Sequence, residues 1–275
     1  MSKRIVSLAF EKYATAAKSH AGPPLIISHG LFGSKQNWRT LAKVFSTRLS
    51  RDVYTVDLRN HGDSCRSDVH TFDSMANDLT QFIADQGLEQ PVLVGHSMGG
   101  KASMACALQS PTAISHLVVI DMPPVPLSYV LRFGKYVEAF RAIKERRPDR
   151  LATASKILEQ YEPNQGVRSF LLTNLRRNEA TGSYSIKANY ETLGKSLDDI
   201  AAFDTQGTFA KPTLFIAGGD SPYRQKFLVY RDTIRAMFPN STLETIEGAG
   251  HWVHADQPEA FVKLMIKTFM PSGSH

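Results

Sequence analysis

Short apolar runs alternate along this chain with longer stretches of amphipathic helical pattern, and this alternation most constrains the fold. Runs of strand character occupy residues 4–10, 24–28, 52–56, 91–94, 116–120, 213–217 and 242–246. Apolar residues recur at helical spacing in residues 36–48, 71–86, 98–109, 225–237 and 257–270. Such alternation is typical of an α/β protein with a mostly parallel sheet. We expect the first run, residues 4–10, to be one arm of a hairpin.

One long stretch breaks this alternation. Residues 127–199 show helical pattern without a convincing buried strand, and they carry 13 basic against 9 acidic side chains. The strand pattern then resumes. We therefore predict a core of residues 1–124 and 200–275, with a helical lid, residues 125–199, inserted before the last two strands. The basic balance of the lid hints at anionic substrates such as coenzyme A thioesters, although a solvated helical surface explains it more simply.

Composition excludes several classes of protein. The chain has 275 residues, of which 42% are hydrophobic and 21% charged, as expected of one large globular domain or a core with an insertion. No apolar run reaches the roughly 20 residues of a membrane span. The net charge is +6, yet no basic tract favours nucleic-acid binding. Cys65 and Cys106 fit neither a disulfide framework nor a metal site, and we expect reduced thiols in an intracellular protein without a signal peptide.

The strongest chemical signal is the G-x-S-x-G pattern at residues 95–99. It lies between a predicted strand and a predicted helix, which is the context that a nucleophilic serine on a sharp turn requires. Glycines flank the turn because side chains there would collide with neighbouring backbone. Ser97 is therefore the candidate nucleophile, and helix capping is its alternative role.

A serine hydroxyl is a weak nucleophile and needs a base, and its tetrahedral intermediate needs hydrogen-bond donors. His251 lies on a glycine-containing loop after the last predicted strand and is the candidate base. The backbone N–H of Met98, at the start of the helix, is one candidate oxyanion donor. The glycine-rich bend at residues 29–33 should supply the second, from Leu31, with Phe32 lining the pocket beside it.

A polar loop, residues 57–64, follows the strand at 52–56. We interpret it as structural. A network of ion pairs or hydrogen bonds from Asp57 and Arg59 is expected to brace the loop that carries His29 and Gly30.

Four stretches then establish a resemblance: HGLFGSKQNW at residues 29–38, DLRNHGDS at 57–64, GHSMGGK at 95–101 and GAGHWVHADQP at 248–258. In order and spacing they resemble the α/β-hydrolase superfamily over essentially the whole chain. More narrowly, they are similar to the esterase family typified by α/β-hydrolase domain-containing protein 11, with bacterial esterases and yeast acetyltransferases among its relatives. The resemblance implies an α/β-hydrolase fold, a Ser–Asp–His serine hydrolase with a helical lid, and neither cofactor nor metal. For a eukaryotic member it implies the mitochondrion; otherwise we expect the cytoplasm.

Two carboxylates compete for the place of the acid. The usual position in this superfamily follows the strand before the last one, where Asp220 lies, but the common H-G-D-x-D form puts the catalytic residue second, and that position is Pro222 here. The esterase family named above takes its acid from an I-D-x-x-P setting, which residues 120–124 nearly reproduce. We therefore predict that Asp121 orients His251, with Asp220 as the alternative acid and a turn-capping role for Asp121 still open.

The leading function is hydrolysis of carboxylic esters or thioesters of small to medium acyl groups through an acyl-enzyme on Ser97. An alcohol acyltransferase would use the same acyl-enzyme. A vitamin K pathway-type lyase and a non-catalytic hydrolase-fold receptor also remain open, whereas haloalkane dehalogenases and epoxide hydrolases need an aspartate in place of Ser97. We expect a small-molecule partner and a monomer or weak dimer. Phe133 and Phe140 of the lid, with Trp252, are further candidates for the pocket wall, and changing the two phenylalanines should alter chain-length preference.

Overall fold

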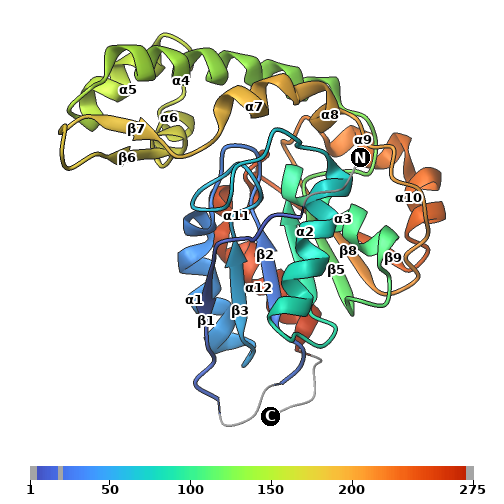
Figure 1. Ribbon diagram of the computed structural model, residues 1–275. Helices are drawn as coiled ribbons and strands as arrows, with labels where there is room; N and C mark the ends of the chain where they lie inside the picture. The colour runs from blue at the N-terminus through green and yellow to red at the C-terminus, as the bar shows by residue number, and fades with distance from the viewer. Residues whose placement is uncertain (1–4, 18–20, 271–275) are drawn as a thin grey trace.

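The computed structural model describes residues 5–17 and 21–270, and its centre is a mostly parallel sheet (Figure 1). The strand order is β1-β3-β2-β4-β5-β8-β9, and of these seven described strands β1 alone runs antiparallel to its neighbour. The strands are β1 (Phe10–Tyr13), β2 (Leu25–Ser28), β3 (Val53–Val56), β4 (Val92–His96), β5 (His116–Ile120), β8 (Thr213–Gly218) and β9 (Ser241–Ile246).

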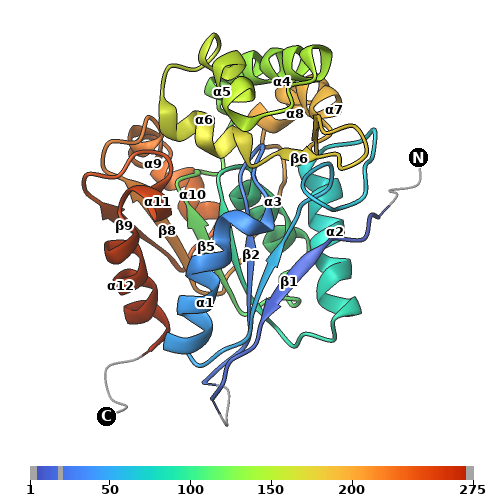
Figure 2. The same cartoon turned by 90° about the vertical axis from the view of Figure 1, so that its left-hand side faces the viewer.

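Helices cover both faces of this sheet. Figure 2 shows α1 (Arg39–Arg48) and α12 (Pro258–Phe269) on one side, and α2 (Phe72–Asp85) on the other, where α3 (Met98–Gln109) also packs. Successive residues of a strand point to opposite faces, so Val92 and Val94 pack under α1 and α12 while Leu93 packs under α2 and α3. Burial on both faces explains why the inner strands β2, β4, β5 and β8 are mainly apolar, whereas the edge strands β1 and β9 are partly exposed and more polar. None of the described helices is long and apolar enough to span a bilayer.

Two predicted elements differ from the structure. The opening strand was expected at residues 4–10 in a hairpin, but β1 begins at Phe10 and pairs with β3 instead of β2. Before Phe10 the backbone bonds to a helix instead of a strand: the N–H of Val6 donates to the Asp78 carboxylate on α2. The helix expected at residues 225–237 is divided at Tyr230 into α9 (Arg224–Val229) and α10 (Arg231–Met237).

The inserted segment, residues 125–199, lies over the carboxyl ends of the central strands (Figure 1). Its helices share one apolar cluster with α2 and α3. It also contains a short hairpin that the helical pattern did not predict, because each strand has three residues that are mostly not buried. The predicted division into core and lid stays a prediction. The elements here are η2 (Ser128–Phe133), α4 (Gly134–Arg146), α5 (Leu151–Glu159), α6 (Gln165–Leu172), β6 (Leu175–Arg177), β7 (Tyr184–Ile186), α7 (Tyr190–Lys195) and α8 (Leu197–Ala201).

Candidate active site

The candidate site lies at the carboxyl edge of the sheet, where parallel strands deliver their following loops to one place. The glycine-rich bend follows β2, Ser97 follows β4, Asp121 follows β5 and His251 lies on the loop after β9. The structure thus brings together three residues that are far apart in the sequence.

Ser97 occupies the sharp turn between β4 and α3. Its backbone angles are φ 54° and ψ −121°, in a region where only glycine is at ease. The flanking glycines are required: a Cβ on Gly95 would lie 2.3 Å from the carbonyl oxygen of Gly99, and a Cβ on Gly99 would lie 2.5 Å from that of His29. The turn therefore holds the Ser97 hydroxyl at the top of the sheet.

A continuous hydrogen-bonded path joins the three side chains. The Ser97 Oγ lies 2.9 Å from Nε2 of His251, and Nδ1 of His251 lies 2.7 Å from Oδ2 of Asp121. Asp121 is completely buried, and its carboxylate also accepts from the N–H of Gly218, at 3.0 Å, and from the hydroxyl of Ser221. With its Nδ1–H donated to the carboxylate, the imidazole presents the lone pair of Nε2 to the serine.

The alternative acid lies elsewhere. Asp220 is exposed, and its backbone N–H donates to the carbonyl of Ala249. Of the two predicted candidates, Asp121 alone is within hydrogen-bonding distance of His251 in the described structure.

A second imidazole, which the sequence analysis did not assign to the site, holds the backbone of His251. His96 donates from Nε2 to the carbonyl oxygen of His251, at 2.9 Å, so the proton is assigned to Nε2. Burial lowers the pKa of His96 well below its ordinary value, which keeps the ring neutral. Its position inside the G-x-S-x-G pattern was the only signal in the sequence.

The glycine-rich bend is a tight turn that passes directly over Ser97. The N–H of Gly33 donates to the carbonyl of Gly30, and a Cβ on Gly30 would lie 3.2 Å from the Cβ of Ser97. Phe32, third in this turn, has φ 59°, a left-handed conformation that costs a non-glycine residue roughly 1–2 kcal/mol. Neighbouring groups must hold it there.

Two backbone N–H groups around Ser97 are available to a ligand. Within the described residues, the N–H groups of Leu31 and Met98 donate to no protein acceptor, whereas the N–H of Phe32 donates to Nε2 of His61, at 3.1 Å. Leu31 and Ser97 line the same cavity, and Met98 opens helix α3. This arrangement suits the predicted pair of oxyanion donors.

His29 and His61 fasten the bend to the polar loop after β3 in a reciprocal way. The N–H of Leu58 donates to Nε2 of His29, at 3.1 Å, just as that of Phe32 donates to His61. Each ring donates from Nδ1 to a backbone carbonyl, and burial lowers the pKa of both, so both rings are neutral.

Within the described residues no group of three or more His, Cys, Asp or Glu side chains is placed to hold a metal ion.

The predicted bracing role of the polar loop is confirmed for one of its two residues. The Asp57 carboxylate accepts from the backbone N–H and the Nζ of Lys35, both at 2.6 Å, just after the bend. Arg59 acts elsewhere: its guanidinium forms a buried pair with Asp78 on α2, at 2.6 Å.

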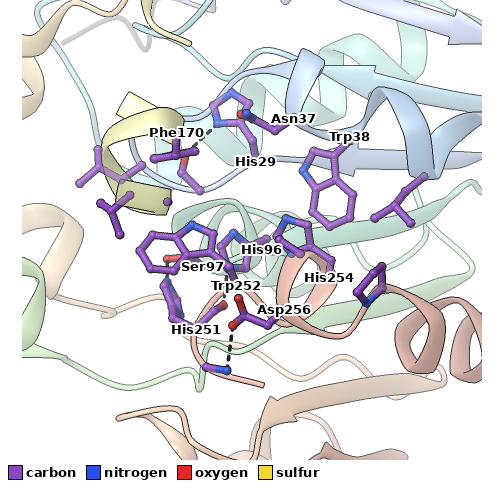
Figure 3. Close-up of a pocket in the computed structure, with 18 of the residues that line it drawn as sticks. His29, Asn37, Trp38, His96, Ser97, Phe170, His251, Trp252, His254 and Asp256 are labelled. Carbon is purple, nitrogen blue, oxygen red and sulfur yellow. Dashed lines mark hydrogen bonds between the residues drawn. The ribbon is translucent and has the colours of Figure 1, made fainter. Parts of the chain in front are cut away.

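A cavity of about 650 Å³ opens beside Ser97 and His251 (Figure 3). The inserted segment contributes to its wall, where the Phe170 ring packs 6.0 Å from that of Trp252. A volume in this range suits a small organic molecule. The apolar side chains on the wall are Leu31, Trp38, Leu41, Phe133, Val167, Phe170, Trp252, Ala255 and Pro258.

Two of the four predicted wall residues lie on this cavity and two do not. Phe133 and Trp252 line it. Phe32 and Phe140 are fully buried and pack against each other, with ring centroids 5.3 Å apart. The expectation that Phe32 and Phe140 line the cavity is therefore wrong. The left-handed turn at Phe32 directs its ring toward α4, where it packs against the ring of Phe140.

Comparisons with known proteins show the family to which this chain belongs. The family model described as alpha/beta hydrolase fold matches residues 23–258. The chain is 42% identical over 245 residues to a mouse protein named sn-1-specific diacylglycerol lipase ABHD11, with 87% of this chain and 78% of that one covered. It is 35% identical to Esterase YbfF of Escherichia coli, with 91% and 94% covered.

A relative of a different name and a solved structure are also similar. A Saccharomyces cerevisiae protein named probable alcohol acetyltransferase is 36% identical, over 86% of this chain and 74% of that one. A solved structure titled marine microorganism esterase superposes with a TM-score of 0.86 at 34% identity, covering 95% of this chain and 99% of that one. The expected fold class is thereby confirmed.

Proposed function

Because this chain belongs to the α/β-hydrolase family, we propose that Ser97 attacks the carbonyl carbon of an ester or thioester and is acylated. The similarity to proteins named lipase and esterase identifies the chain as a carboxylic ester hydrolase. One observation carries the finer proposal: the hydrogen-bonded path from Asp121 through His251 to Ser97 ends at a largely apolar cavity.

In acylation His251 acts first as a base and then as an acid. His251 takes the proton of Ser97 at Nε2 while Oγ forms a bond to the carbonyl carbon, and the buried Asp121 carboxylate stabilises the imidazolium. The negative charge that develops on the carbonyl oxygen is met by the N–H groups of Leu31 and Met98. The intermediate then collapses, the bond to the leaving oxygen or sulfur breaks, and Nε2 of His251 returns the proton to that atom.

Deacylation repeats the sequence with water. His251 takes one proton of the water as its oxygen attacks the acyl carbon, and then protonates the Ser97 Oγ as the carboxylic acid leaves. An alcohol in place of water would give a new ester by the same steps. The yeast relative's name makes this acyl transfer the second candidate function, and added ethanol would separate the two by the ratio of ester to free acid.

The substrate class that we propose is a carboxylic ester or thioester with a small to medium acyl group. The cavity lies within the usual range for drug-sized ligands, and its wall is mainly apolar. The mouse relative is named for a lipid ester, diacylglycerol. The test substrates should therefore include esters with longer acyl chains.

A fluorophosphonate probe tests the proposed nucleophile. Such a probe phosphonylates an activated serine and expels fluoride, so we expect one adduct per chain, located on Ser97 by peptide mass spectrometry. The rate of hydrolysis of p-nitrophenyl esters of graded chain length should fall in proportion to the fraction of protein that is labelled. An adduct on a different serine, or hydrolysis that persists in fully labelled protein, would contradict the proposal.

The two lid phenylalanines should now behave differently. Phe133→Ala is expected to change the preference among p-nitrophenyl esters of graded chain length, because Phe133 lines the cavity. Phe140→Ala should instead lower the free energy of unfolding by about 3–5 kcal/mol, because its ring is fully buried. Denaturant unfolding and kcat/KM across the ester series measure both effects. Equal changes in preference for both variants would contradict this assignment.

A further inference from the structure

We propose that Asn174 is a positioning residue for the oxyanion hole, through a hydrogen bond from the inserted segment to the bend over Ser97. Asn174 lies between α6 and β6, and its Nδ2 donates to the carbonyl oxygen of Phe32, at 2.7 Å across 142 positions of sequence. The side chain is 3% exposed. The inference rests on the proposed function, because it assigns the N–H of Leu31 as an oxyanion donor.

The orientation of the Asn174 amide follows from its neighbours. Nδ2 faces two acceptors that cannot donate, the carbonyl of Phe32 and, at 3.3 Å, that of Leu171. The amide nitrogen must therefore be the atom that points at the bend. Asn174 is itself held by its backbone, which donates to Leu171 and accepts from the N–H of Lys187, at 2.8 Å.

Phe32 is consequently held on both of its peptide groups. Its N–H donates to His61, which belongs to the core, and its carbonyl accepts from Asn174, which belongs to the inserted segment. The inserted segment also holds its ring, because Tyr136 and Phe140 on α4 pack against it with centroids 6.4 and 5.3 Å away. These contacts stabilise the left-handed conformation that Phe32 alone would avoid.

Holding Phe32 also holds Leu31, its neighbour in the turn. When the Phe32 peptide groups are fixed at both ends and the Gly30–Gly33 hydrogen bond closes the turn, little freedom remains for the N–H of Leu31. An oxyanion donor acts only if it is aimed in advance at the developing charge. Docking of the inserted segment thus contributes to catalysis beyond forming the cavity wall.

Asn174→Asp tests this step, because aspartate keeps the shape of asparagine and loses the N–H donor. We expect kcat per active site to fall about tenfold with KM within about twofold, since a misaimed donor weakens the transition state more than substrate binding. Active sites are counted by complete fluorophosphonate labelling. The affinity for a trifluoromethyl ketone, which forms a tetrahedral adduct with Ser97, should fall by the same factor as kcat/KM.

Asn189→Asp is the matched control. Asn189 also joins the inserted segment to the core, by donating from Nδ2 to Oδ1 of Asn60, at 3.1 Å, but it does not touch the bend. We expect its kcat and its trifluoromethyl ketone affinity to stay within about twofold of wild type.

Three outcomes would overturn the inference: equal losses in Asn189→Asp, loss in Asn174→Asp confined to KM, or an unchanged ketone affinity. If the buried aspartate prevents folding, Asn174→Ala, which loses the donor without adding a charge, should show the same pattern. Full activity in a folded Asn174→Ala would also overturn the inference. The proposed function fails separately, by unchanged hydrolysis when Ser97 itself is removed.

Discussion

Ser97→Ala is expected to lower ester hydrolysis by a factor of about 10³ or more, because no covalent route remains once Oγ is gone. The residue that is removed has its hydroxyl 2.9 Å from Nε2 of His251, and the left-handed turn that presents it does not depend on its side chain. We therefore expect the variant to fold, with a melting temperature close to that of the wild type. Initial rates on p-nitrophenyl esters measure the loss.

Ser185→Ala supplies the matched control for the nucleophile. Ser185 is exposed on β7, and its hydroxyl donates to the backbone carbonyl of Arg176, at 3.3 Å, away from the site. Its rates and its fluorophosphonate labelling should equal those of the wild type. Ser97→Ala protein that keeps more than a tenth of wild-type activity would show that Ser97 is not the nucleophile.

Asp121→Asn should lower kcat by about 10³–10⁴, while Asp220→Asn should lower it by no more than about tenfold. An asparagine amide could keep its oxygen toward Gly218 and face Nδ1 of His251 with an N–H in place of an acceptor. With its oxygen toward His251 and Ser221 instead, its N–H would be placed against the N–H of Gly218. The Gly218 N–H disfavours the second arrangement, and in the first the imidazole tends toward the tautomer with a proton on Nε2, which cannot accept from Ser97. Asp220 is exposed, and its backbone N–H donates to the carbonyl of Ala249.

The two aspartate variants should be compared on one ester substrate after circular dichroism has shown both to be folded. A larger loss in Asp220→Asn than in Asp121→Asn would move the acid to Asp220. Equal small losses would show that neither carboxylate orients His251.

The local features of this protein could be predicted from the sequence. Helix α3 and strand β5 were expected with the bounds that the structure has, since each is a short apolar run ended by its own turn residues. The turn at Ser97 was also evident, because the backbone that excludes a side chain at Gly95 belongs to Gly99 and Gly100, only four and five residues along the chain. Such signals act over a few residues, so one sequence is enough to reveal them.

The sequence could not predict relations between distant segments. It could rank Asp121 above Asp220 only by resemblance and on the condition that the strand before Asp121 neighbours the strand before Ser97. The structure has that pairing, of β4 with β5, and it brings Nδ1 of His251 to 2.7 Å from Asp121. It assigned Phe32 and Phe140 to the cavity wall, but an apolar side chain suits a cavity wall and a packed core equally well. The choice between them depends on the backbone direction at Phe32.

Asn174 shows most clearly what only the tertiary structure decided. Nothing in the residues around it points to a role, because its partner, the Phe32 carbonyl, is a backbone group present at every position. The sequence by itself determined the strand–helix alternation and the turn at Ser97, since these depend on local periodicity and local sterics. The packing of residues 125–199 on the sheet decided which buried groups meet, because a hydrogen bond needs a donor and an acceptor about 3 Å apart, and only folding brings them there.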